Sequence, residues 1–137
     1  MRTEKSYGVI PFIRNENQLF VLLIKQTNGV ISFPKGHAEP NETEEETAIR
    51  ECIEETNLKP TIVDGFKESI SYFMPEYHAN KVVVYFVAFV NPQNIEKQIE
   101  EIDDVYVCSI EEALERISFD GTKTLLRKAV EFVGKKH

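Results

Sequence analysis

The chain has 137 residues, of which 42% are hydrophobic and 28% charged, a composition typical of one folded domain and not of a disordered segment. Its 16 Lys and Arg residues against 23 Asp and Glu residues give a formal net charge of −7. Duplex nucleic acids and anionic membranes bind proteins through basic faces, so this balance argues against both partners. An acidic protein that acts on phosphates needs positive charge from elsewhere, and a divalent metal ion is the usual source.

No targeting or membrane segment is evident. The N-terminus lacks the apolar core of a signal peptide, and the longest apolar run, residues 82–90, has the length of a strand. Cys52 and Cys108 have no CxxC spacing, so we expect two buried thiols in a reducing compartment. We therefore expect residues 1–137 to form one cytoplasmic domain, as a monomer or a homodimer.

The N-terminal third reads as strands and a loop. Residues 6–13 and 18–24 are rich in β-formers, and the polar residues 14–17 between them predict a hairpin turn. A shorter strand is predicted at 30–33. Two prolines and a glycine then indicate a structured loop at 34–41.

Residues 43–57 have helical periodicity. Their apolar stripe comprises Ala48, Ile49, Cys52, Ile53 and Thr56. Thr43 followed by Glu46 predicts a capping box at the start, and Asn57 suits the left-handed residue that ends a helix. We expect this helix to bury its apolar stripe and to expose the opposite, acidic face.

The remaining chain alternates between strands and helices. Strands are predicted at 61–63, 66–74, 81–90 and 105–107, and helices at 110–117 and 122–133. The strand at 81–90 is apolar on both faces, which is typical of a strand buried between two layers. The sequence therefore predicts an α/β/α sandwich, with a mixed sheet between helices.

Three carboxylates share one side of the helix at 43–57. Glu51, Glu54 and Glu55 stand at i, i+3 and i+4, and Arg50 is the only cation near them in sequence. Such a group is either a solvated acidic face or a site for a hard cation such as Mg²⁺ or Mn²⁺, which prefers carboxylate oxygens.

The segment GHAEPNETEEETAIRECIEETNL, residues 36–58, combines that triplet with fixed spacings on both sides. It resembles the signature box of the Nudix hydrolases. The matching positions are Gly36, Glu42, Arg50, Glu51, Glu54, Glu55 and Leu58. Cys52 stands at the apolar position, and Asn57 replaces the final glycine, a mild change because Asn also adopts the left-handed conformation.

The resemblance implies hydrolysis of a nucleotide phosphoanhydride with Mg²⁺ or Mn²⁺. Glu51, Glu54 and Glu55 would be metal ligands together with the carbonyl of Gly36, and Glu51 and Glu55 would be catalytic. Glu51 is also a candidate general base. Arg50 would orient the carboxylates through charged hydrogen bonds.

Family members often carry one more acidic residue on a loop before a late strand. The stretch at residues 100–105 resembles that region, and Glu101 is the expected further metal ligand or base. A solvated loop residue is the alternative.

The residues before the box resemble the Pro-Lys-Gly-His element of asymmetric diadenosine tetraphosphate hydrolases. Lys35 would pair with the polyphosphate chain, and His37 would contact phosphate or assist proton transfer. Around Pro75, aromatic residues favour a nucleobase site, and Tyr77, Lys81 and Tyr85 are the expected binding set.

The leading prediction is an enzyme that splits diadenosine tetraphosphate into ATP and AMP. The alternative within the family is a pyrophosphohydrolase for an oxidised nucleoside triphosphate, an RNA 5′-triphosphate end or a nucleoside diphosphate sugar. Isopentenyl diphosphate isomerases share the fold, but they need a reactive cysteine motif that is missing here. A nucleotide sensor without activity would have a broken box, and this box retains all three glutamates and Arg50.

Overall fold

The computed structural model describes residues 2–94 and 102–136. Within them, seven strands form one sheet: β1 (Arg2–Asn15), β2 (Gln18–Gln26), β3 (Ile31–Ser32), β4 (Lys35–Gly36), β5 (Thr61–Met74), β6 (Ala79–Phe89) and β7 (Ile102–Ser109). The helices are α1 (Glu44–Thr56), α2 (Ile110–Arg116) and α3 (Asp120–Lys136), with 3₁₀ turns η1 (Pro75–Tyr77) and η2 (Pro92–Asn94). None of the helices described is long and apolar enough to cross a membrane.

The sheet is mixed, as the sequence predicts. Its main path runs β3-β2-β1-β6-β5, while β7 pairs with β2 and β4 pairs with β1. β1 and β6 are parallel, and the other pairs are antiparallel. The β1–β2 hairpin turns tightly after Asn15, which pairs with Gln18, and Glu16 takes a positive φ of 58° in the turn.

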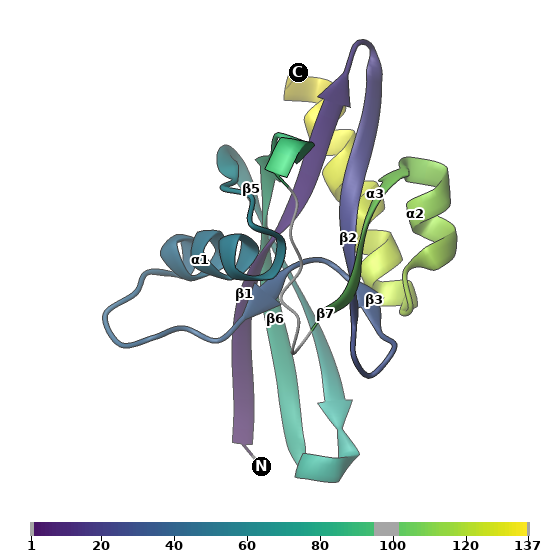
Figure 1. The fold of residues 1–137 in the computed structure, drawn as a ribbon. Coiled ribbons are helices and arrows are strands. Elements are labelled where there is room, and N and C mark those ends of the chain that lie inside the picture. Colours follow the sequence, from purple (N-terminus) through teal and green to yellow (C-terminus); the bar gives the residue numbers. More distant parts are fainter. Residues whose placement is uncertain (1, 95–101, 137) are drawn as a thin grey trace.

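Helices cover both faces of this sheet, which confirms the α/β/α sandwich (Figure 1). On one face, Ala48 and Cys52 of α1 pack against strand residues such as Val9 and Phe86. On the other face, Ala113 of α2 and Leu126 of α3 close a second core. β6 contributes to both cores, in agreement with its apolar pattern on both sides.

Several predicted boundaries differ from the structure. The loop expected at 34–41 contains strand β4, and the two strands expected at 61–63 and 66–74 are one strand, β5. A bulge between Val63 and Lys67 shifts the register of β5 against β6, which explains why the pattern reads as interrupted.

The orientation of α1 also differs from the expectation. Ile53, predicted to lie in the buried stripe, is 38% exposed, whereas Glu55, predicted on the outer face, is only 4% exposed. The helix is rotated so that Ala48, Cys52 and Glu55 share the inward side. Glu55 stands three residues after Cys52, a spacing that makes the two side chains neighbours on a helix.

Candidate functional site

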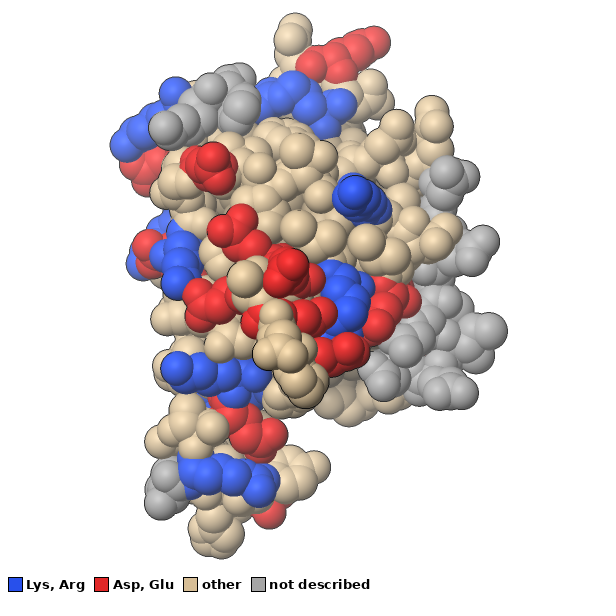
Figure 2. Space-filling model, turned by 90° about the vertical axis from the view of Figure 1, so that its left-hand side faces the viewer, with Lys and Arg blue, Asp and Glu red and all other residues tan. Residues whose placement is uncertain are grey.

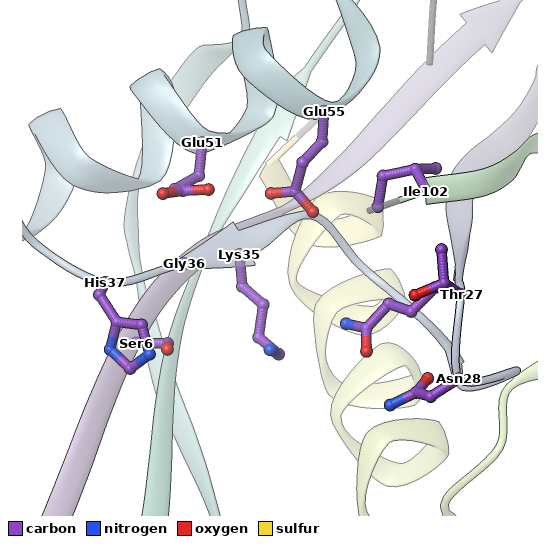
Figure 3. Close-up of a pocket in the computed structure, with 10 residues that line it drawn as sticks. Ser6, Thr27, Asn28, Lys35, Gly36, His37, Glu51, Glu55 and Ile102 are labelled. Carbon is purple, nitrogen blue, oxygen red and sulfur yellow. The ribbon is translucent and has the colours of Figure 1, made fainter. Parts of the chain in front are cut away.

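A cavity of about 400 Å³ lies between α1, β4 and the end of β2 (Figure 3). That volume is within the usual range for small-molecule sites. Its lining residues are Ser6, Gln26, Thr27, Asn28, Lys35, Gly36, His37, Glu51, Glu55 and Ile102. The structure thus brings together Lys35, His37, Glu51 and Glu55, four of the residues that the sequence predicts for the site.

The caps of α1 fix the helix that carries the acidic residues. The Thr43 side chain accepts a hydrogen bond from the Glu46 backbone, and the Glu46 carboxylate accepts one from Thr43 N–H, which confirms the capping box. Asn57 ends the helix in the left-handed conformation, with φ 64°. The predicted helix boundaries are therefore correct, and the glutamates project from a rigid element.

Glu51 and Glu55 point from α1 into the cavity (Figure 3). Burial and the neighbouring Glu51 charge raise the pKa of Glu55 to about 9, and burial also raises the pKa of Glu51. Glu55 Oε2 is buried and has no hydrogen-bond partner within the described residues. With a pKa near 9 this carboxyl is protonated at neutral pH even though Lys35 lies near it, and a bound cation would favour its charged form.

The backbone beside these carboxylates approaches them closely. A Cβ atom at position 36 would overlap the Glu51 carboxylate, so glycine is the residue that leaves room for it. Glu51, Glu55 and the Gly36 carbonyl offer only oxygen ligands, which fit Mg²⁺ or Mn²⁺. No cluster of three or more His, Cys, Asp or Glu side chains suited to a metal occurs in residues 2–94 and 102–136.

Glu54, the third acid of the triplet, faces Arg50 instead of the cavity. Arg50 donates hydrogen bonds to Glu42 at 2.6 Å, to Glu51 at 3.0 Å and to Glu54 at 3.1 Å. It also donates to the carbonyl of His37 at 2.8 Å. These contacts lower the pKa of Glu42 to about 2 and raise the pKa of Arg50. Arg50 therefore holds the loop before α1 against the helix through charged hydrogen bonds.

A second set of contacts builds a basic wall, which we define as Lys35, His37 and Lys81. Lys81 Nζ lies 2.5 Å from Ser6 Oγ and 3.5 Å from His37 Nε2, and His37 Nδ1 donates to the carbonyl of Lys5 at 3.1 Å. Burial and the nearby Lys35 charge lower the pKa of Lys81 to about 8, and burial lowers the pKa of Lys35. The wall places basic side chains together in a protein that is acidic overall. On the face drawn in Figure 2, Asp and Glu side chains gather across the middle, with Lys and Arg side chains beside them.

Three other predicted residues lie elsewhere. Tyr77 is 60% exposed on η1, at the tip of the β5–β6 hairpin, and it does not line the cavity. Tyr85 is fully buried, with its hydroxyl 3.3 Å from Ser32 Oγ and its ring edge-on to Phe33, so it has no face free for a base. Glu101 lies outside the described residues.

Tyr72 is one of the aromatic residues considered around Pro75, but the partner of its ring, Phe119, was missed by the sequence reasoning. Tyr72 of β5 pairs in register with Lys81, so the two side chains share a face of the sheet. Its ring stacks against Phe119, which precedes α3, with centroids 6.2 Å apart. Both rings are partly exposed, at 39% and 51%. Their positions are 47 residues apart, and no local sequence signal links them.

The chain is similar to known proteins in both sequence and fold. The NUDIX domain model matches residues 3–128. Asymmetrical bis(5′-nucleosyl)-tetraphosphatases of Mus musculus and Sus scrofa are 31% and 30% identical to this chain over 131 residues, covering 91% of it and 87% of each relative. A solved binary complex of a C. elegans Ap4A hydrolase superposes with a TM-score of 0.88 at 27% identity, covering 96% of this chain and 98% of that one. The chain belongs to the Nudix family of hydrolases.

Proposed function

We propose that this hydrolase splits diadenosine tetraphosphate asymmetrically into ATP and AMP, with Mg²⁺ or Mn²⁺ as cofactor. The observation that carries the proposal is one cavity that Lys35 and His37 line together with Glu51 and Glu55, with Lys81 Nζ 3.5 Å from His37 Nε2. A polyphosphate needs cations along its length, and a metal ion needs carboxylates. The cavity provides separate groups for both.

The reaction needs a nucleophilic water and a stabilised polyphosphate. Glu51, Glu55 and the Gly36 carbonyl would hold a divalent ion, which would supply charge neutralisation and lower the pKa of bound water. Glu51 is the nearer candidate to accept the proton from water, because Arg50 keeps its carboxylate oriented. A new P–O bond forms as the bridging P–O bond breaks, and the leaving nucleotide keeps the electron pair of that bond. Lys35, on β4 between the carboxylates and His37, stabilises the developing negative charge.

The aromatic pair Tyr72 and Phe119 provides a platform for one adenine. Both rings are partly exposed and lie nearly parallel, with an interplanar angle of 26°, so they offer aromatic surface on which a base can stack. This pair replaces Tyr77 and Tyr85 as the expected nucleobase site, while Lys81 stays in the binding set.

The relatives support the substrate class. Two curated proteins that match most of the chain are named as asymmetrical bis(5′-nucleosyl)-tetraphosphatases. Another nucleotide, such as an oxidised nucleoside triphosphate, an RNA 5′-triphosphate end or a nucleoside diphosphate sugar, is the alternative substrate. Each of these alternatives would use the same metal ligands.

Product analysis tests the proposal. The purified protein with Mg²⁺ is incubated with diadenosine tetraphosphate, nucleoside triphosphates, ADP-ribose and a 5′-triphosphate RNA, and the products are separated by anion exchange. We expect ATP and AMP in equal amounts, formed fastest from the dinucleotide. Faster cleavage of another substrate, with the dinucleotide left intact, would assign the enzyme to a different nucleotide.

A further inference from the structure

Lys81 is the member of the basic wall that does not itself line the cavity. Its side chain is buried, and its ammonium contacts two residues that do line the cavity, Ser6 and His37. Figure 3 shows these two residues together at one side of the cavity. Ser6 pairs in register with Val83, two residues after Lys81, so Ser6 and Lys81 share a face of the sheet.

The two acceptors of the Lys81 ammonium are unequal. Ser6 Oγ lies 2.5 Å from Lys81 Nζ, whereas His37 Nε2 lies 3.5 Å from it. Hydrogen bonds from a nitrogen donor are typically about 2.9 Å long, so the first contact is short and the second is at the long limit. The Ser6 hydroxyl, itself only 1% exposed, is therefore the main anchor of this buried ammonium.

A carboxylate lies within reach of the same ammonium. Glu4 of β1 pairs in register with Lys81 of β6, so it is the direct neighbour of Lys81 on the same face of the sheet. The Glu4 side chain instead contacts Arg2, at 3.3 Å, and no ion pair joins Glu4 to Lys81 within residues 2–94 and 102–136. This is notable because a carboxylate binds an ammonium more strongly than a neutral hydroxyl does.

The charges around Lys81 act against its observed position. Burial and, after it, the Lys35 charge lower the pKa of Lys81 to about 8, while the Glu4 charge acts to raise it. Lys35 lines the cavity and repels the Lys81 ammonium from it, and Glu4 attracts the ammonium along β1 toward the N-terminus. The hydrogen bond to Ser6 therefore holds Lys81 where these two charges alone would not leave it.

We propose that Ser6 is a positioning residue, which keeps the Lys81 ammonium beside the cavity and prevents it from turning to Glu4. This inference rests on the proposed function, in which Lys81 attracts the polyphosphate chain. Without the Ser6 oxygen, the buried ammonium loses its nearest acceptor and pairs with the Glu4 carboxylate, because a buried charge without a partner is costly. The positive charge then leaves the cavity.

Steady-state kinetics of Ser6→Ala, Glu4→Gln and the double variant test the inference. The substrate is the member of the product-analysis panel that the wild type cleaves fastest, because every member contains linked phosphates. A different preferred nucleotide would thus change the proposed function but still test Ser6. Ser32→Ala is the matched control, since it removes another buried serine hydroxyl, whose partner is Tyr85. Thermal midpoints verify that each variant is folded.

The expected result is a loss that a second substitution reverses. Ser6→Ala should lower kcat/KM about tenfold, mainly through KM, because the charge that attracts the polyphosphate is displaced. The double variant should recover to within about threefold of the wild type, since the competing carboxylate is gone. Glu4→Gln alone should stay within about twofold. Ser32→Ala should lower the thermal midpoint without raising KM.

A crystal structure of Ser6→Ala gives a second readout that does not depend on activity. It should show Lys81 Nζ at a Glu4 carboxylate oxygen, and an ammonium still beside His37 Nε2 would overturn the inference. Unchanged KM in Ser6→Ala, a double variant as impaired as Ser6→Ala, or an equal rise of KM in Ser32→Ala would also overturn it and leave the proposed function standing. A wild-type protein that cleaves no member of the panel would overturn both.

Discussion

The carboxylates on and before α1 form two groups that differ in their hydrogen-bond partners. Around Arg50, the carboxylates of Glu42 and Glu54 accept hydrogen bonds from one guanidinium. One turn further along, Glu55 is buried, and its Oε2 atom has no partner among the described residues. The first group is complete without a ligand and holds the loop in place, whereas the second leaves a buried carboxylate oxygen for the proposed cation to bind. One acidic signature therefore serves both architecture and chemistry.

Among the substitutions in these two groups, we expect Glu55→Gln to have the largest effect, and to have it on catalysis. Glu55→Gln removes charge from the cavity while keeping the side-chain shape, so we expect kcat to fall by about three orders of magnitude. Without metal at pH 7 the variant should be about as stable as the wild type, because a Glu55 carboxyl with a pKa near 9 is already uncharged there. Steady-state kinetics and thermal melts measure both effects. Glu45→Gln, on the exposed first turn of α1, is the control and should retain activity. Full activity in Glu55→Gln would refute its role as a metal ligand.

Breaking the other group should reduce stability. Arg50→Lys keeps the charge but loses the planar fork that contacts Glu42, Glu51, Glu54 and the His37 carbonyl. We expect the free energy of unfolding to fall by about 2 kcal/mol, because these carboxylates lose charged hydrogen bonds. Urea denaturation at pH 7 measures the change. Lys128→Ala, whose cation pairs with Glu68 on the surface, should cost much less. A similar loss in both variants would contradict the special role of Arg50.

The pH dependence of stability should distinguish the metal-free and metal-bound proteins. The pKa of Glu55 is raised to about 9 from the usual 4.5 of a glutamate, so the folded state holds its proton more tightly than the unfolded state. Stability of the metal-free protein should therefore fall as pH rises from about 5 to 9. Mg²⁺ should raise the melting temperature more at pH 9 than at pH 6. In Glu55→Gln, both the pH slope and the Mg²⁺ effect should shrink, and a slope that persists would contradict the assignment.

The smallest expected effect has the opposite sign. Arg50 lowers the pKa of Glu42 to about 2, so its contribution to stability is complete above about pH 4.5 and is lost as pH falls through 2. Glu42→Gln should make the acid limb of the stability curve shallower without changing the slope near pH 9. Thermal melts between pH 2 and 5 test this, with the exposed Glu111→Gln as control. An altered alkaline slope would show that the two groups are coupled.

The sequence predicted what depends on local chemistry. The helix caps of α1, the hairpin at Glu16 and the apolar pattern of β6 each follow from a few neighbouring residues, and the structure confirms them. The motif also identified the carboxylates of α1. These features are local because backbone capping and side-chain periodicity act over four residues or fewer.

Other features depend on contacts between distant segments. The rotation of α1 that buries Glu55 and exposes Ile53 follows from how the helix packs on the sheet. The core accommodates the polar hydroxyl of Tyr85 because Ser32 is its hydrogen-bond partner. The composition of the chain does not reveal this contact between distant residues. The stack of Tyr72 on Phe119 requires the turn before α3 to return to β5. These positions depend on contacts formed in the complete fold, so local sequence patterns do not predict them.

The parallel pairing of β1 with β6 has a consequence for how the enzyme matures. Arg2 pairs with Ala79 and Phe12 with Phe89, so the first strand finds its partner only after more than half of the chain has been made. Contacts of such long sequence separation slow folding, because the loop between them must close first. The Ser6–Lys81 contact belongs to this pairing. A nascent chain that lacks β6 therefore carries the acidic signature with Lys35 and His37 but without Lys81, so the basic wall is completed late in synthesis.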